Sequence, residues 1–150
     1  MAQPDLAVYG PGGELELVVE VKNRSGASPE WVAQLRRNLL ADSIIPNARY
    51  FLLALPDFFY LWKDGTSSAD IAPDYQIDTT QILESYTNGV RESLNDLSGY
   101  GFELLVSAWL EDLVHSDLEP KRIDPHLRWL FDSGLYEAVK NGSIAIEAAV

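Results

Sequence analysis

The chain has 150 residues, of which 47% are hydrophobic, and its 23 Asp and Glu against 11 Lys and Arg give a net charge of -12. This length suffices for one domain with a substantial core, while the acidity disfavours a free-standing binder of polyanions. The absence of cysteine excludes disulfides, thiolate metal sites and cysteine nucleophiles. Because no apolar run reaches the ~20 residues that span a bilayer and no secretion signal is evident, we expect a cytoplasmic protein without a membrane partner.

A β-hairpin is predicted at the start of the chain. Residues Leu6–Tyr9 read as a short strand, Gly10–Gly13 as the turn, and Glu14–Val21 as the partner strand. Two registers fit this turn: Asp5 lies opposite either Val19 or, after a shift of one residue, Glu20. Only the second register puts both carboxylates on one face of the sheet.

The end of this hairpin carries side chains suited to metal-dependent chemistry. Glu20 and Lys22 share one face of their strand because side chains alternate with a period of two. Hard cations such as Mg²⁺ prefer oxygen ligands and use one or two carboxylates, which Asp5 and Glu20 would supply. Lys22 would offset the charge that develops on a phosphoryl group.

A helix is predicted after the hairpin, with Ser28 as its N-cap and Pro29 in its first position. We expect Arg36 and Arg37 to point toward solvent or substrate. The apolar stripe that should face the sheet comprises Trp31 or Val32, Leu35, Leu39 and Leu40.

A second hairpin and a helical part complete the predicted elements. Arg49–Leu55 is nearly all apolar, as in a strand covered on both faces, and Phe58–Trp62 follows after a short turn. The aromatic residues of the second strand suit core packing better than base stacking. Residues 66–78 read as a surface connection. The later expected elements are a helix from Thr80 with Leu83, Tyr86, Val90, Leu94 and Leu97 on one stripe, a helix over Phe102–Val114, a helix over Pro125–Lys140 interrupted near Gly134, and a short strand over Ile144–Ile146.

The order of these features resembles the PD-(D/E)XK nuclease superfamily over roughly the first 62 residues. The motif reads Pro4-Asp5, fourteen residues, then Glu20-Val21-Lys22, followed by a helix and a strand. The resemblance implies that Asp5 and Glu20 bind Mg²⁺ or Mn²⁺ and that Lys22 positions or activates the attacking water. Some members carry a glutamine on the helix, facing the metal, which would correspond to Gln34. A glutamine on a helix is also an ordinary solvated residue.

The expected fold is therefore α/β, with a restriction endonuclease-like core whose mixed, largely antiparallel sheet is flanked by helices, plus a helical C-terminal part. We expect one domain over 1–150: the nuclease-like core in 1–65, the connection in 66–78 and a helical extension packed on the core in 79–150. Family members usually have a helix, often with an acidic residue, and a strand before the Asp strand. Here Asp5 is too close to the start for both, through either truncation or loss.

Two functions are consistent with these features. The first is metal-dependent hydrolysis of nucleic-acid phosphodiesters, with DNA favoured over RNA. Residues 20–50 suit phosphate contact, since they hold an excess of two positive charges: Lys22, Arg24, Arg36, Arg37 and Arg49 against Glu20, Glu30 and Asp42. The second is a catalytically silent module that binds a protein partner, or a second copy of itself, through the C-terminal helices. That module would keep the nuclease fold. A separate and plainer interpretation of the motif makes Asp5 a turn residue, and Glu20 and Lys22 an outward-facing pair on an amphipathic strand.

Overall fold

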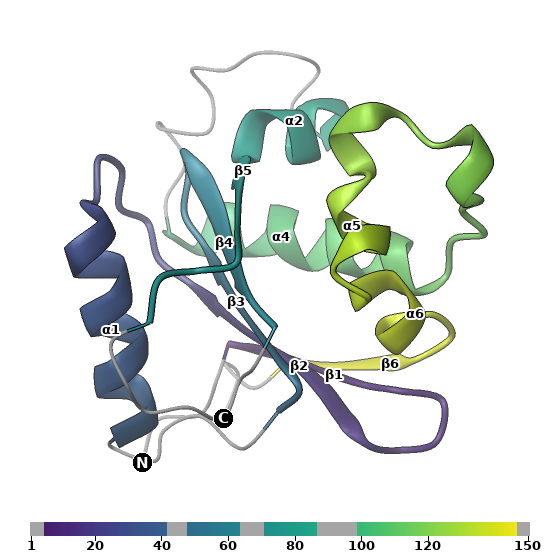
Figure 1. Ribbon diagram of the computed structural model, residues 1–150, viewed down its shortest axis with the longest axis horizontal. Helices are drawn as coiled ribbons and strands as arrows, with labels where there is room; N and C mark the ends of the chain where they lie inside the picture. Colours follow the sequence, from purple (N-terminus) through teal and green to yellow (C-terminus); the bar gives the residue numbers. More distant parts are fainter. Residues whose placement is uncertain (1–4, 42–47, 64–70, 87–98, 147–150) are drawn as a thin grey trace.

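The fold is α/β and is built around one six-stranded mixed sheet (Figure 1). The computed structural model describes residues 5–41, 48–63, 71–86 and 99–146, with no side-chain detail for residues 99 and 100. The sheet has the order β5-β4-β3-β2-β1-β6, and β2 and β3 are parallel while the other four neighbouring pairs are antiparallel. The strands are β1 (Leu6–Tyr9), β2 (Leu15–Val21), β3 (Tyr50–Ala54), β4 (Phe58–Trp62), β5 (Tyr75–Asp78) and β6 (Ser143–Ile146). The expected largely antiparallel sheet is confirmed.

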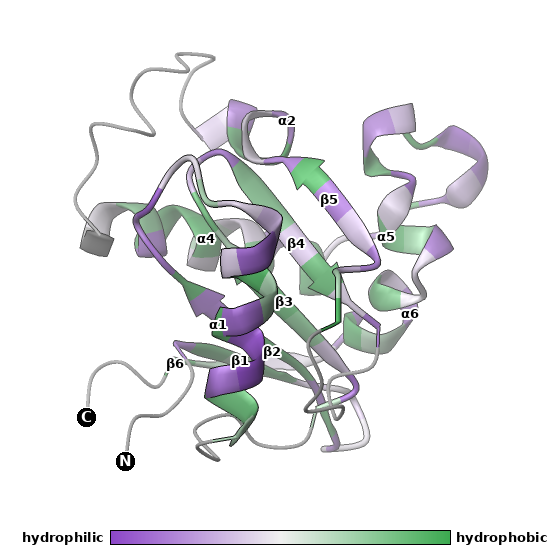
Figure 2. Ribbon diagram, turned by 60° about the vertical axis from the view of Figure 1, so that its left-hand side comes forward, coloured by the Kyte–Doolittle hydropathy of each residue, from purple (hydrophilic) through white to green (hydrophobic). Residues whose placement is uncertain are grey.

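Helices cover both faces of the sheet and enclose two hydrophobic layers. Helix α1 (Pro29–Ala41) covers one face, where Val32 packs with Val18 of β2 and Phe51 of β3. Helix α1 contains both hydrophilic and hydrophobic residues, whereas β3 is mostly hydrophobic (Figure 2). The other face carries α2 (Thr79–Leu83), α4 (Gly99–Val114), α5 (Trp129–Asp132) and α6 (Leu135–Val139), with the short 3-10 helices η1 (Glu84–Tyr86), η2 (Pro120–Arg122) and η3 (Pro125–Leu127) in the connections. No described helix is long and apolar enough to cross a membrane.

A one-residue bulge in β2 sets the register of the first hairpin. Near the turn Tyr9 lies opposite Leu15, but Val8 lies opposite Leu17, so Glu16 is the extra residue. Beyond the bulge Leu6 lies opposite Val19, and the same register puts Asp5 opposite Glu20. Without the bulge Asp5 would face Val19. Of the two predicted registers, the structure therefore has the one that brings the carboxylates together.

Helix α1 begins as predicted but buries one residue that was expected outside. The backbone N–H of Trp31 donates to Ser28 Oγ (3.1 Å), which is the expected N-cap. Arg36, in contrast, is fully buried, and its guanidinium carbon lies 5.4 Å from the centre of the Trp62 ring. The exposed position expected for Arg36 was wrong. It lies one turn after Val32 on the face toward the sheet, and its aliphatic stem packs in the core while its guanidinium stacks on the indole.

The segment expected to be a plain connection contains a strand. Tyr75–Asp78 form β5, which pairs with β4 at one edge of the sheet. The short alternation of Tyr75 and Ile77 among polar residues is a weak strand signal, and the pairing with β4 decides the outcome. Residues 66–70 lie outside the described residues, as do Pro4 and the predicted helix positions Val90, Leu94 and Leu97.

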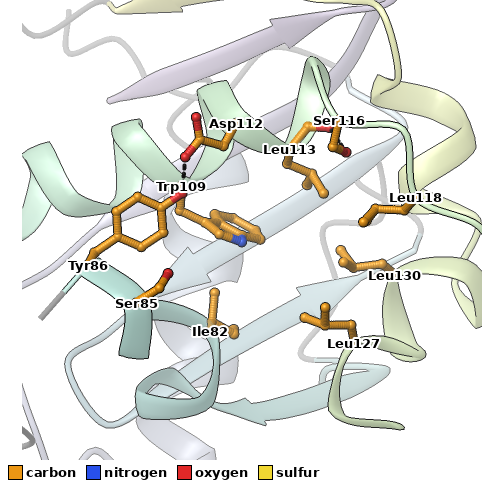
Figure 3. Close-up of a pocket in the computed structure, with 10 residues that line it drawn as sticks. All are labelled: Ile82, Ser85, Tyr86, Trp109, Asp112, Leu113, Ser116, Leu118, Leu127 and Leu130. Atoms are coloured by element: carbon orange, nitrogen blue, oxygen red, sulfur yellow. Dashed lines mark hydrogen bonds between the residues drawn. The ribbon is translucent and has the colours of Figure 1, made fainter. Parts of the chain in front are cut away.

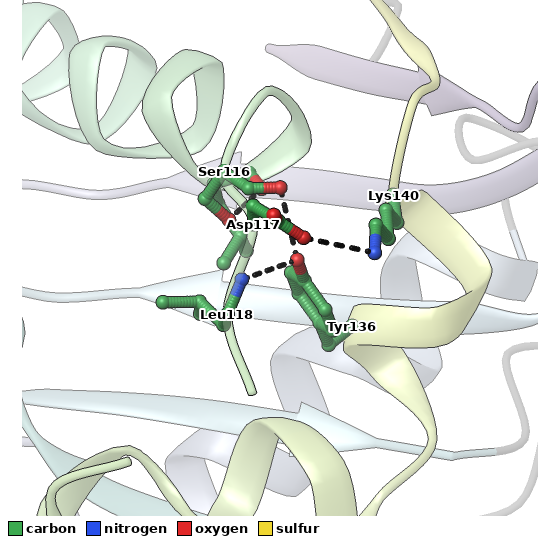
Figure 4. A network of polar contacts seen from close by, with 6 residues as sticks. Ser116, Asp117, Leu118, Tyr136 and Lys140 are labelled. Atoms are coloured by element: carbon green, nitrogen blue, oxygen red, sulfur yellow. Dashed lines mark hydrogen bonds and ion pairs between the residues drawn. The ribbon is translucent and has the colours of Figure 1, made fainter. Parts of the chain in front are cut away.

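The C-terminal part contains the predicted helices and adds a strand to the sheet. Helix α4 is present, and the predicted helix over Pro125–Lys140 is divided into η3, α5 and α6, with a break at Gly134 (φ 83°). The expected short strand is β6, which pairs antiparallel with β1. Figure 4 shows how this part is fastened: the Tyr136 hydroxyl accepts from the Leu118 N–H and donates to the Ser116 carbonyl (both 2.9 Å). Strand β1, which follows Asp5, is therefore paired on one side with β2 and on the other with β6.

Candidate functional site

Three of the four predicted site residues come together where β1 begins and β2 ends. Asp5 Oδ2 accepts a 2.7 Å hydrogen bond from the backbone N–H of Val21, which fixes the carboxylate beside the E-x-K segment. Glu20 is 4% exposed, and its Oε2 lies 3.8 Å from the Nζ of Lys22. The side chain of Lys22 is 43% exposed, so its ammonium reaches solvent while Glu20 lies beneath it.

Glu20 is held in an environment that is unfavourable for its charge. Burial, followed by repulsion from Asp5, raises the pKa of Glu20 from 4.5 to about 7, although Lys22 acts in the opposite direction. One of its oxygens, Oε1, is buried and has no hydrogen-bond partner. A buried carboxylate oxygen without a donor is rare and calls for an explanation such as an ion. The Glu20–Lys22 pair is therefore not an ordinary outward-facing ion pair.

A third carboxylate, which sequence reasoning missed, lies near Asp5. Glu103 lies near the start of α4, and burial together with repulsion from Asp5 raises its pKa above the ordinary range. Its Oε1 is also buried without a hydrogen-bond partner. The available signal was a single acidic residue within the strongly apolar run around Phe102 and Leu105. Its proximity to Asp5 could not be read from the sequence, because it depends on how α4 packs.

Gln34 is placed apart from the other predicted site residues. It is exposed, and it lies two positions from both Val32 and Arg36, which are buried against the sheet. Two helical positions correspond to a rotation of about 200°, so Gln34 is on the side of α1 away from the sheet. The structure describes no contact between Gln34 and Glu20 or Lys22. A role for it in orienting water remains a prediction.

The donor set fits a hard divalent cation better than a softer metal. Carboxylate oxygens are the groups that Mg²⁺ and Mn²⁺ prefer, and the orphaned oxygen of Glu20 offers a ligand. Within the described ranges, no group of three or more acidic, histidine or cysteine side chains is close enough to form a metal cage. Mg²⁺ does not require such a cage, because it usually keeps several waters and binds through one or two carboxylates.

No known family model, curated protein or solved structure matches this chain. The assignment of a function therefore depends on the geometry of its own residues.

A separate hollow of about 180 Å³ is lined by residues of α2, η1, α4, η3 and α5 and of the segment after α4 (Figure 3). The Tyr86 hydroxyl donates to Asp112 at its rim, and the remaining surface is mostly apolar. Among its described lining residues, Asp112 is the only one with a charged side chain. Its lining residues are Ile82, Ser85, Tyr86, Trp109, Asp112, Leu113, Ser116, Leu118, Leu127 and Leu130. A protein partner on these helices remains a prediction.

Proposed function

We propose that this protein is a metal-dependent nuclease that hydrolyses phosphodiester bonds of nucleic acid, most readily DNA. The observation that carries the proposal is the environment of Glu20: its Oε1 is buried without a hydrogen-bond partner, and the same carboxyl group lies beside Asp5 and Lys22. A buried carboxyl group beside a second carboxylate is disfavoured in its ionised form unless positive charge is placed next to it. A divalent cation supplies that charge, and Lys22 alone does not prevent the rise in the pKa of Glu20.

Each residue of the group has a distinct task in this proposal. Asp5 and Glu20 would hold Mg²⁺ or Mn²⁺ through carboxylate oxygens, and Val21 keeps Asp5 in place through its N–H. When bound, the cation supplies a hydroxide at neutral pH and polarises a phosphoryl oxygen. Lys22 offsets the negative charge on the phosphate that is attacked, and it orients the attacking water. Because a carboxylate must be deprotonated to bind a cation, Glu20 would lose its proton to solvent on binding.

The C-terminal part supports the proposal by supplying the elements that the resemblance leads us to expect before Asp5. The expected elements are a helix with an acidic residue and a strand. In this chain β6 pairs with β1 on the side opposite β2, and Glu103 of α4 is near enough to Asp5 for repulsion between the two groups to raise the pKa of Glu103. We infer that α4 and β6 serve the site from the C-terminal side, and that Glu103 strengthens cation binding through Asp5 or through a bound water.

Cleavage assays on labelled single- and double-stranded DNA and RNA, with Mg²⁺ or Mn²⁺, test the proposal. Lys22→Ala should lower the rate about 100-fold or more, the scale for losing one group that stabilises charge in a transition state. The matched control is Lys140→Ala, which also removes a lysine paired with a carboxylate, Asp117 at 3.5 Å, but on the helical side. Full activity in the Lys22 variant, with a circular dichroism spectrum like that of the wild type, would refute the proposal.

A further inference from the structure

The loop that follows the E-x-K segment is fastened to the neighbouring turn. The backbone N–H of Lys22 donates to the carbonyl of Ala54 (3.1 Å). Further along the loop, the N–H of Gly26 donates to Asp57 Oδ2 (2.8 Å), while the other oxygen of Asp57 accepts from the N–H of Phe58 (3.0 Å). Asp57 therefore ties this loop to the turn between β3 and β4, and the residues between the two anchors have a set position.

Arg24 lies between these anchors and has an unusual partner for a cation in an acidic protein. It is exposed, and its guanidinium carbon lies 4.3 Å from the centre of the Trp31 ring. Among the residues that the structure describes, no carboxylate forms an ion pair with Arg24. Arg49 also stacks on an aromatic ring, that of Tyr50 at 5.5 Å, but its Nη1 is 3.8 Å from Glu16. Stacking holds the Arg24 guanidinium without neutralising it.

The chemistry of this arrangement fits a phosphate of a nucleic-acid strand. A stacked guanidinium still presents its N–H groups at the edge of its plane, in the fork geometry that binds phosphate with two hydrogen bonds. Arg24 follows Lys22 by two residues, so their Cα atoms are at most about 7 Å apart. With a net charge of -12, the protein needs local cations of this kind to approach a polyanion.

We propose that Arg24, stacked on Trp31, binds a backbone phosphate next to the scissile one and so holds the substrate strand against the site. This inference rests on the proposed nuclease function and adds to it the element that binds the strand. Because Arg24 is exposed, we expect its replacement to leave the fold intact. The same replacement at Arg49, near the opposite end of β2 and β3, changes the net charge equally and is the matched control.

The test measures KM and kcat for cleavage of a short single-stranded DNA by the wild type, Arg24→Ala and Arg49→Ala. Arg24→Ala should raise KM about tenfold or more, the scale for hydrogen bonds to a charged group, and leave kcat within about twofold. It should also lower the slope of log affinity against log salt by about one. Arg49→Ala should change neither quantity, and Trp31→Leu, which keeps the charge but removes the stack, should raise KM by less than Arg24→Ala does.

A second measurement locates the contact. Oligonucleotides in which one phosphate at a time is replaced by a neutral methylphosphonate should show one position at which Arg24→Ala has no further effect on KM. The inference about Arg24 would be overturned by equal KM values for the Arg24 and Arg49 variants, or by an effect of Arg24→Ala that is the same at every phosphate position. The nuclease proposal would still stand in that case, provided that the wild type cleaves DNA. A wild type that neither binds nor cleaves DNA would overturn both.

Discussion

Replacing Glu20 with glutamine should stabilise the metal-free protein at high pH and not at low pH. In the unfolded chain Glu20 loses its proton near pH 4.5, whereas in the folded protein it keeps the proton up to about pH 7. Between these pH values the folded state therefore binds more protons than the unfolded state. The stabilisation that protonated Glu20 gives the wild type is fully present below pH 4.5 and is lost as the pH rises through 7. A tenfold change in an acid constant corresponds to about 1.4 kcal/mol, so the full effect is roughly 3 kcal/mol.

Urea unfolding in the presence of a chelator, from pH 4.5 to 8.5, measures this effect. The free energy of unfolding of Glu20→Gln minus that of the wild type should increase by roughly 3 kcal/mol over the range, because the amide cannot ionise. A constant offset from the altered hydrogen bonding does not matter, since only the change with pH is tested. Asp5 and Lys22 are present in both proteins, so their direct contributions largely cancel in the difference.

Glu16→Gln is the matched control for this experiment. Glu16 lies four residues earlier on the same strand, and its Oε2, which is also buried without a hydrogen-bond partner, lies 3.8 Å from Nη1 of Arg49. Because its replacement removes the ion pair with Arg49, Glu16→Gln should not stabilise the protein. At pH 8.5, Mn²⁺ at 100 times its Kd should raise the free energy of unfolding of the wild type by about 2.7 kcal/mol. It should not change the stability of Glu20→Gln. A difference between Glu20→Gln and wild type that is independent of pH, or that grows toward low pH, would refute this account of the site.

Two further substitutions test the parts of the site that come from the C-terminal segment. Glu103→Gln should weaken Mn²⁺ binding about tenfold, as for groups that support metal ligands. Glu111→Gln, at an exposed position on the same helix, should not weaken it. Equal affinities of the two variants for Mn²⁺ in calorimetry would exclude Glu103 from the site. Gly142→Ala should destabilise the protein by about 2 kcal/mol, since its Cβ would overlap the Tyr9 carbonyl oxygen where β6 joins β1. Gly12→Ala, with no atom within 4 Å of the new Cβ, should leave the urea midpoint nearly unchanged, and a similar loss in both variants would contradict the role given to β6.

The local features of the site could be predicted from the sequence because short patterns determine them. The Gly10–Gly13 turn, the alternation that puts Glu20 and Lys22 on one face and the Ser28 N-cap depend on residues close together in the chain. The register of Asp5 depends on a bulge at Glu16. That bulge has no signature in the residue pattern, so the sequence left two registers open.

The features that were missed depend on contacts between distant segments. Glu103 and Asp5 are 98 positions apart in the chain, and nothing local links them. The burial of Arg36 depends on Trp62 from β4, whose indole accepts the guanidinium as a stacking partner. Strand β5 is short and polar, and it exists because the edge of β4 offers hydrogen bonds to it. In each case tertiary packing overrides the local preference.

Calorimetric titration of Mn²⁺ into the wild type, Glu20→Gln and Glu16→Gln, alone and with a short DNA present, tests the central claim most directly. The account predicts binding to the wild type and to Glu16→Gln, and none to Glu20→Gln. Equal binding by all three proteins, or no binding to the wild type even with DNA present, would contradict it.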